Sequence, residues 1–171
     1  NFPHISPEFN AVVGRHIENE CKDLEFSLKD PDFILNIDIN QDGAYLYLET
    51  ICCHGGLPAG VEGTVMLLIE DKASILAGLQ FMKRGCNIFP VAFEEKDLSL
   101  LQKFSPRQLK LKIVQGLSEL EALGSKYKIY VLVSGQHFKQ YKKYDTSLLP
   151  MRPLISYDDA QIDQRLQEYA A

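Results

Sequence analysis

The amino-acid sequence predicts an α/β protein in which an open parallel sheet follows a smaller segment made of a helix and a hairpin. Apolar runs at 64–69, 87–93 and 128–133 are typical of strands that are buried on both faces. A stretch with helical spacing separates the first two runs, which predicts a right-handed βαβ unit. Upstream, residues 33–39 and 44–52 alternate apolar and polar side chains around the turn NQDG, as the strands of a hairpin do.

Composition excludes several classes of protein. Hydrophobic residues make up 46% of the 171 residues and charged residues 24%, which is typical of a globular chain and not of a disordered tail or a disulfide scaffold. No apolar run approaches the ~20 residues that a membrane span needs, and no signal-peptide pattern is present. We therefore expect a cytoplasmic protein with no membrane partner. Because the chain does not begin with Met, we expect it to be a fragment.

The net charge of −5 is distributed unevenly along the chain. Residues 1–60 hold three basic and ten acidic residues, whereas residues 61–171 hold 15 basic and 13 acidic ones. Within the second part, residues 103–143 hold nine basic and two acidic residues, a local charge of +7. An acidic chain is a weak candidate for nucleic-acid binding, but this basic stretch could contact phosphates.

The first sixty residues predict one helix and one hairpin. Residues 7–21 have an apolar face at helical spacing, with Ser6 expected as the cap and Pro7 in the first turn. Gly43 suits the positive φ of the hairpin turn. A helix and a hairpin cannot bury a core of their own, so this segment needs more chain or a partner surface.

Residues 54–63 contain four glycines and a proline, which is typical of a linker. The helix between the first two buried strands is expected over 73–85, with Gly85 at its C-terminal end. Its expected inner face consists of Ile75, Leu76, Leu79 and Met82.

The rest of the chain predicts three more helices. Residues 105–124 predict a long helix that Ser105 caps and Gly124 ends. The stretch 134–145, after the third buried strand, predicts a second helix. The run LLPMRPLI is expected to be extended, and a last helix follows it with Ser156 as its cap.

The cysteines spell no zinc or redox motif, because Cys21, Cys52, Cys53 and Cys86 form no CxxC pair. Cys52 and Cys53 could supply metal ligands together with His54. Packed, reduced thiols in a cytosolic protein are the favoured interpretation.

Ligands bind open parallel sheets at the carboxyl ends of the strands, so a site is expected in the loops after the buried strands. The first loop, IEDKAS, has no glycine, although a phosphate-binding loop presents bare backbone amides. Glu70 and Asp71 would place two negative charges where phosphates lie, and Lys72 offsets only part of them. Such repulsion at 4 Å costs about 1 kcal/mol in water and several times more when partly buried.

No motif for nucleophilic, zinc or nucleotide chemistry occurs, since GxSxG, HExxH and Walker A patterns are all missing from the sequence. His137 is the only histidine at an expected site edge, and a surface residue is the favoured interpretation over a catalyst. Glu94 and Glu95 form a carboxylate pair that a solvated loop explains. We therefore expect no catalytic residue and no metal site.

The stretch GGLPAGVEGTVMLLIEDKASILAGLQFMKRGCNIFPVAF, residues 55–93, resembles the tRNA 4-thiouridine synthetase (ThiI) family. In that family a THUMP domain leads through a GGLPxGxxG linker into a PP-loop, or ATP pyrophosphatase, domain. The resemblance implies the C-terminal part of a THUMP domain at 1–54, a linker at 55–63 and a PP-loop domain at 64–171. The implied fold is Rossmann-like, of the adenine nucleotide alpha hydrolase type, and the family's ferredoxin-like domain and first half of THUMP would precede residue 1.

The departures from the family pattern fall on its ATP site. The family motif SGGxDSP falls on the stretch IEDKASI, so that only Ser74 remains, and the aspartate of its TGD motif falls on Gln136. No cysteine follows Cys86, so the family's reactive cysteines have no counterpart, and Cys86 is expected to be buried. The predicted degenerate nucleotide loop comprises Ile69, Glu70, Asp71, Lys72, Ala73, Ser74 and Gln136.

Three functions stay open at this point. The favoured one is a non-catalytic, tRNA-associated protein that binds RNA or supports a separate PP-loop or sulfur-carrier protein, with no cofactor, although the family uses ATP and Mg²⁺. The second is an active ATP-dependent tRNA sulfurtransferase with unusual site residues, and the third is an interaction module without a nucleic-acid role. The candidate RNA-contacting residues are Lys139, Lys142, Lys143 and Arg152, with a solvated helix face as the favoured alternative.

Overall fold

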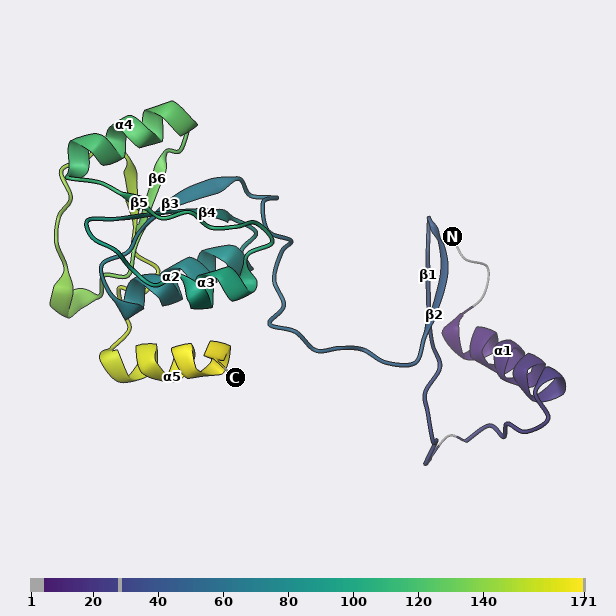
Figure 1. Ribbon diagram of the computed structural model, residues 1–171. Coiled ribbons are helices and arrows are strands. Elements are labelled where there is room, and N and C mark those ends of the chain that lie inside the picture. The colour runs from purple at the N-terminus through teal and green to yellow at the C-terminus, as the bar shows by residue number, and fades with distance from the viewer. Residues whose placement is uncertain (1–4, 28, 171) are drawn as a thin grey trace. The chain divides into compact units, whose positions relative to one another are not determined.

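The structure is a computed structural model that describes residues 5–27 and 29–170 (Figure 1). The chain divides into two compact units between Cys52 and Cys53. The first unit holds the predicted helix and hairpin, and the second holds the parallel sheet. No helix in these ranges is long and apolar enough to cross a bilayer.

The first unit consists of helix α1 (Ser6–Glu20) and a two-stranded antiparallel sheet of β1 (Asn36–Asn40) and β2 (Gly43–Tyr47). The predicted helix and hairpin are confirmed, although both strands are shorter than expected. Asn40 and Gly43 face each other across the turn, where Gly43 has a φ of 153°. None of the described residues of this unit is buried, in agreement with the expectation that it cannot hold its own core.

The expectation that Ser6 caps α1 is wrong by one residue. The amide of Phe9 donates to the carbonyl oxygen of Ile5 at 3.1 Å, and this helical bond places Ser6 inside the first turn. Ile5 therefore occupies the cap position without a side-chain bond, and Pro7 lies in the first turn as predicted.

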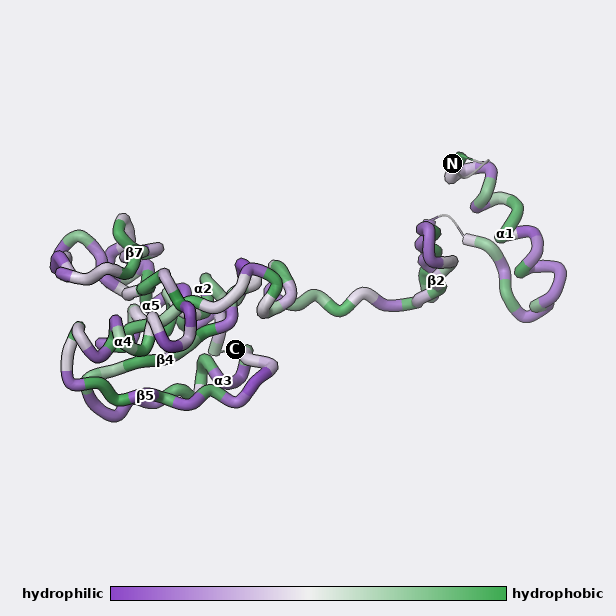
Figure 2. The backbone as a smooth tube through the Cα atoms, turned by 90° about the horizontal axis from the view of Figure 1, so that it is seen from above, coloured by the Kyte–Doolittle hydropathy of each residue, from purple (hydrophilic) through white to green (hydrophobic). Residues whose placement is uncertain are grey.

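The second unit is built on a five-stranded sheet in the order β5-β4-β3-β6-β7, in which all neighbouring strands are parallel. Figure 2 shows that the chain through β4 is mostly hydrophobic, as expected of a buried strand. The strands are β3 (Thr64–Leu68), β4 (Asn87–Ala92), β5 (Lys112–Ile113), β6 (Val131–Ser134) and β7 (Leu149–Met151).

Helices cover both faces of this sheet. Figure 1 shows α2, α3 and α5 on one face and α4 on the other. Alternate residues of β3 supply both cores, since Leu67 packs in the cluster with α2, whereas Met66 and Leu68 pack in the cluster with α4. The helices are α2 (Lys72–Lys83), α3 (Ser99–Phe104), α4 (Leu117–Tyr127) and α5 (Asp159–Ala170), with a short 3-10 helix η1 (Phe138–Gln140).

The predicted βαβ unit of β3, α2 and β4 is confirmed. Asp71 caps α2, and Gly85 follows its end with a φ of 86°. Leu76, Leu79 and Met82 are buried as predicted. Ile75 is only partly buried and packs against the same core.

The glycine-rich stretch before β3 is bonded to the C-terminal end of α2. The amide of Leu57 donates to the carbonyl oxygen of Lys83 at 2.9 Å. The amide of Gly60 donates to the carbonyl oxygen of Gly85 at 2.7 Å. These bonds hold the stretch within the second unit, while the predicted domain boundaries at 54 and 63 stay a prediction.

The predicted helix over 105–124 is wrong. Residues 105–111 are irregular, because Gln102 Oε1 accepts the amide of Leu109 at 2.7 Å. The next residues form β5, and the amide of Val114 donates to the carbonyl oxygen of Ala92 at 2.9 Å. Helix formation is thus overridden by pairing with the open edge of β4.

Helix α4 covers only the last part of that stretch, and Gly124 does not end it. Gly124 is buried inside α4, where a Cβ would lie 2.9 Å from Leu148. The helix runs on to Tyr127, and Lys128, with a left-handed φ of 55°, caps its C-terminal end.

Two further expectations about helices are wrong. Residues 134–145 form only the short helix η1, because Gln136 Oε1 accepts the amide of Lys142 at 3.2 Å and holds the chain in an irregular path. In α5 the cap is Asp158, whose Oδ1 accepts the amide of Gln161 at 2.8 Å while Gln161 Oε1 accepts the amide of Asp158 at 3.0 Å. This reciprocal pair replaces the cap expected at Ser156.

Candidate functional site

The loop from β3 to α2 is closed by its own side chains. The Asp71 carboxylate accepts the amide of Ser74 at 3.1 Å, and Ser74 Oγ accepts the amide of Glu70 at 3.1 Å. Ile69 is buried, and its amide donates to the carbonyl oxygen of Val91 in β4 at 2.8 Å. A carboxylate thus occupies the N-terminus of α2, where an anionic ligand would otherwise meet free backbone amides.

Lys72 does not neutralise this loop in the expected way. Its ammonium group pairs with Asp163 of α5, and this carboxylate raises the pKa of Lys72. The neighbouring Ala73 is buried in the core. Lys72 therefore pairs with Asp163 of α5 and not with Glu70 or Asp71.

A hydrogen-bond network joins the ends of β3 and β6. The hydroxyl group of Tyr144 donates to Glu70 Oε2 at 2.7 Å and accepts from Gln136 Nε2 at 2.6 Å. Arg152 Nε donates to Gln136 Oε1 at 3.0 Å. We call Glu70, Gln136, Tyr144 and Arg152 the Tyr144 network.

The surroundings of Tyr144 keep its hydroxyl group protonated, and a cation lies beside its ring. Burial, together with the hydrogen bond to the Glu70 carboxylate, raises the pKa of Tyr144, so that the hydroxyl stays a donor at neutral pH. The Arg152 guanidinium lies 4.9 Å from the ring centroid of Tyr141 and 5.5 Å from that of Tyr144. Its Nη2 also donates to the carbonyl oxygen of Lys142 at 3.0 Å.

The residue after β6, Gly135, is in direct contact with the backbone of the first turn of α2. A Cβ added at Gly135 would lie 2.2 Å from the amide nitrogen of Ser74 and 2.3 Å from the carbonyl carbon of Ala73. Only glycine fits at such an approach. No group of the size of a phosphate fits between these two segments.

The residues of the predicted degenerate loop are therefore close in space. Residues 69–74 follow β3, and Gln136 follows β6, which pairs with β3 in parallel with Leu68 opposite Ser134. Sequence reasoning missed Tyr144, which lies 74 residues from Glu70 in the chain. No motif marks this tyrosine, so no sequence signal could have found it.

The candidate RNA-contacting residues are mostly engaged within the chain. Lys142 Nζ lies 3.8 Å from Glu70 Oε1, and Lys139 Nζ lies 3.8 Å from Asp159 Oδ2. Arg152 belongs to the Tyr144 network. Lys143 is exposed and, within residues 5–27 and 29–170, has no ion pair.

Two smaller predictions have opposite outcomes. His137 is 2% exposed, so the expectation of a surface residue is wrong. The amide of Phe138 is bonded to the carbonyl oxygen of Ile155, which holds this stretch against the chain before α5. The exposed pair Glu94 and Glu95 is confirmed as a solvated loop, in which Lys96 lowers the pKa of Glu94.

The four cysteines differ in their burial. Cys86 is buried as expected, and burial raises the pKa of its thiol. Cys52 and Cys53 are exposed, so the packed thiols expected for these two are wrong, because the segment around them has no core; Cys21 is exposed as well. Within the described residues, no group of three or more His, Cys, Asp or Glu side chains could hold a metal ion. His54 instead stacks on Tyr169, with ring centroids 4.8 Å apart.

The chain is similar to known proteins. The THUMP domain family matches residues 1–49. A probable tRNA sulfurtransferase of Geobacillus thermodenitrificans is 34% identical over 132 residues, which are 77% of this chain and 31% of that protein. A probable tRNA sulfurtransferase of Methanocaldococcus jannaschii is 38% identical over 105 residues, which are 60% of this chain and 27% of that protein. The chain spans about a third of the length of these relatives.

Two solved structures resemble the fold. PH1313 from Pyrococcus horikoshii matches with a TM-score of 0.74 and 26% identity, covering 100% of this chain and 62% of that one. A 4-thiouridine synthetase, solved as an RNA complex with bound ATP, matches with a TM-score of 0.65 and 22% identity, covering 99% of this chain and 56% of that one. These similarities support a ThiI-like family for this chain, since residues 1–49 match the THUMP domain and the relatives are named probable tRNA sulfurtransferases.

Proposed function

We propose that this chain is a tRNA-associated, non-catalytic ThiI-like protein whose nucleotide loop no longer binds ATP. The observation that carries this proposal is the bond between Tyr144 and Glu70 at the place where a nucleotide would enter the sheet. The polar groups of Glu70, Gln136 and Tyr144 bond one another there and do not face a phosphate.

ATP with Mg²⁺ does not fit the residues at this position. A triphosphate needs free backbone amides and cations, whereas Asp71 already accepts the amide of Ser74, and Glu70 adds a negative charge. Mg²⁺ is usually held by one or two carboxylates, but here Glu70 is bonded to Tyr144, Asp71 caps α2, and Gln136 offers a neutral amide. Both polar atoms of that amide are bonded, to Tyr144 on one side and to Arg152 and Lys142 on the other.

Three comparisons support the association with tRNA. The THUMP family matches residues 1–49, the relatives are named probable tRNA sulfurtransferases, and a similar fold was solved with RNA. In this proposal the chain binds RNA and leaves the sulfur chemistry to a separate PP-loop or sulfur-carrier protein. The names of the relatives also favour a second candidate, an active ATP-dependent sulfurtransferase.

Calorimetric titration with ATP and Mg²⁺ separates these two candidates. We expect no saturable heat up to ~1 mM ATP, because Asp71 and Glu70 occupy the place of the phosphates. A dissociation constant of ~1 mM corresponds to a binding free energy of only about 4 kcal/mol, so this range covers even weak binding. The probable tRNA sulfurtransferase of Geobacillus thermodenitrificans, titrated in the same buffer, controls for the conditions. Micromolar binding of ATP to this chain would overturn the loss of the site.

Titration with a tRNA transcript tests the other half of the proposal. We expect binding whose affinity falls steeply as salt rises, because phosphate contacts release counterions. A chain that binds no RNA even at low salt would be an interaction module without a nucleic-acid role.

A further inference from the structure

The basic stretch at 103–143 separates into two groups in the structure. The three lysines at its C-terminal end lie in the segment between β6 and β7, where Lys139 and Lys142 face carboxylates. The other six cations have no ion pair among the residues that the structure describes. These six are Lys103, Arg107, Lys110, Lys112, Lys126 and Lys128.

Three of the six cations line one cavity of about 470 Å³. The cavity lies at the amino ends of β3 and β4, at the edge of the sheet opposite the Tyr144 network. Arg107, Lys110 and Lys112 come from the irregular segment after α3 and the start of β5, and all three are exposed. We call the three cations and this cavity the basic pocket.

The lining of the basic pocket contains no carboxylate. The acidic side chains of α4 are bonded elsewhere, since Glu119 accepts the amide of Gln115 at 2.8 Å and Glu121 accepts the amide of Ser147. Glu62, two residues before β3, is the acidic residue that lies nearest to the lining in sequence. The three cations are therefore not neutralised by the walls of the pocket.

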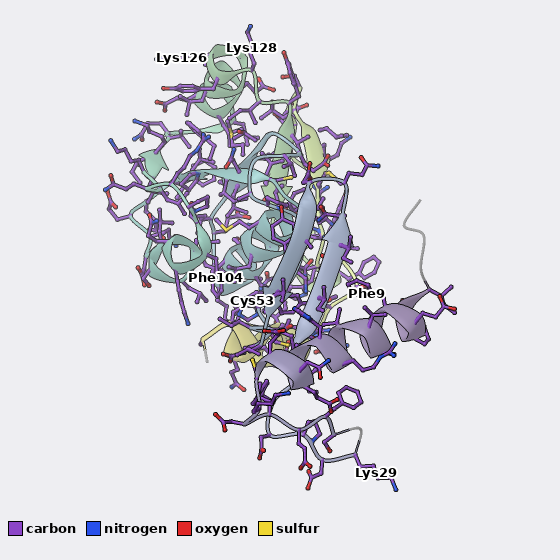
Figure 3. All side chains as sticks on the ribbon, turned by 90° about the vertical axis from the view of Figure 1, so that its right-hand side faces the viewer. Phe9, Lys29, Cys53, Phe104, Lys126 and Lys128 are labelled. Carbon is purple, nitrogen blue, oxygen red and sulfur yellow. The ribbon has the colours of Figure 1, made fainter. Side chains whose placement is uncertain are left out.

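An aromatic ring, that of Tyr127, lines the same pocket, and the residues on either side of it in the chain are two more cations. Tyr127 is 46% exposed and packs on Phe89, with ring centroids 4.9 Å apart. Lys126 Nζ lies 5.5 Å from the centroid of the Tyr127 ring. Figure 3 shows Lys126 and Lys128 at the end of α4, where both side chains are exposed.

We propose that the basic pocket binds the phosphate backbone of RNA through Arg107, Lys110 and Lys112, with Tyr127 offering its ring to a base. This inference rests on the proposed association with tRNA, and it moves the contact away from Lys139, Lys142 and Lys143. Unpaired cations beside an exposed aromatic ring are the arrangement by which proteins hold single-stranded or unstacked nucleotides. The small cavity accepts a chain of phosphates and bases better than it accepts a flat protein surface.

Two triple variants of the full chain test this assignment. Each removes three positive charges, so a difference between them reports the place of the contact and not the net charge. The first is R107A/K110A/K112A and the second, matched in charge, is K139A/K142A/K143A. Binding of a fluorescent, unmodified tRNA transcript is measured by anisotropy between 50 and 300 mM KCl. We expect the first variant to bind at least tenfold more weakly at 100 mM KCl, and the second to change by less than twofold.

The salt dependence gives a second readout. Removing three phosphate contacts lowers the slope of log K against log salt by about 2, at roughly 0.7 per contact for a single strand. Equal losses in both variants, or a larger loss in the second, would overturn the assignment. Unchanged RNA affinity in the first variant would also overturn it and would leave an acidic protein as the partner of the pocket.

Failure of the proposed function is distinguishable from failure of this inference. If the unsubstituted chain binds no tRNA at any salt concentration, the association with tRNA itself is wrong. Lysine acetylation footprinting on the unsubstituted chain keeps the test valid if a triple variant does not fold. RNA is expected to protect Lys110 and Lys112 and to leave Lys143 reactive, and the reverse pattern contradicts the proposal.

Discussion

The parallel sheet has a carboxyl edge, where its strands end, and an amino edge, where its strands begin. These two edges differ in how their charged groups are paired. At the carboxyl edge, Glu70 is bonded to Tyr144 and lies near Lys142, and Asp71 caps α2. At the amino edge, Arg107 and Lys112 line a cavity and have no ion pair within the described residues. The edge that binds ligands in most open α/β sheets is internally satisfied here, and the opposite edge has free charge. Fold alone therefore does not locate a ligand site, and the pairing of the side chains must be examined.

The largest expected effect concerns the backbone contact at the carboxyl edge. Substituting Gly135 by alanine places a Cβ against the backbone of α2, and we expect a loss of about 3 kcal/mol in unfolding free energy. Urea denaturation measures this change. The matched control is Gly116→Ala, because a Cβ at Gly116 meets no atom within 4 Å. Equal stability of the two variants would show that the carboxyl edge is less tightly closed than the structure indicates.

A smaller loss is expected from Tyr144→Phe, which removes the hydroxyl that bonds Glu70 and Gln136. Leaving the partly buried Glu70 and the buried Gln136 without this partner costs about 1–2 kcal/mol. Denaturation with urea at pH 7 measures the loss, and Tyr130→Phe, at a ring that is 71% exposed, serves as the control. A neutral result for Tyr144→Phe would contradict a stabilising role of the network.

The same variant carries a pH signature. Because the folded state raises the pKa of Tyr144, the folded chain holds this proton more tightly than the unfolded chain does. The resulting stability is fully present below pH ~10, the ordinary tyrosine value, and is lost as the pH rises toward the folded pKa. The stability advantage over Tyr144→Phe should therefore shrink as the pH rises above ~10, and an advantage that stays constant to pH 11 contradicts the raised pKa.

At the amino edge, Tyr127→Ala should weaken tRNA binding about fivefold, because stacking of one base contributes roughly 1–3 kcal/mol. Tyr130→Ala removes a more exposed ring near the same end of α4 and should change the affinity by less than twofold. Anisotropy titrations at one salt concentration compare the two variants. Equal affinities would remove the aromatic contact from the proposal and leave the cations alone.

The smallest effect is expected from Lys142→Ala. Its ammonium lies 3.8 Å from Glu70 and is 70% exposed, so the ion pair is worth less than about 0.5 kcal/mol. Denaturation at 20 mM and 300 mM salt should give nearly the same small difference from the unsubstituted chain. A loss above ~1 kcal/mol would mean that the ion pair with Lys142 stabilises Glu70 more than a surface ion pair does.

Local patterns predicted much of the fold correctly. The unit of β3, α2 and β4 follows from continuous apolar strands, a helical stripe and a glycine after the helix. The stretch 105–124 has the same helical spacing and a good starting sequence, yet its first half is not helical. The open edge of β4 recruits Lys112 and Ile113 as a strand, and this long-range pairing has no sign in the local pattern.

The sequence by itself determined that an open parallel sheet is present and that Glu70 and Asp71 stand in its first loop, because apolar runs and residue identities are local properties. Only the tertiary structure decided that Tyr144 bonds Glu70, that Lys139 and Lys142 face carboxylates, and that Arg107, Lys110 and Lys112 surround a cavity. The physical reason is that electrostatic and hydrogen-bond energies depend on distances between groups that lie far apart in the chain. Chain folding sets those distances, so a count of charges along the sequence cannot show which cations are free.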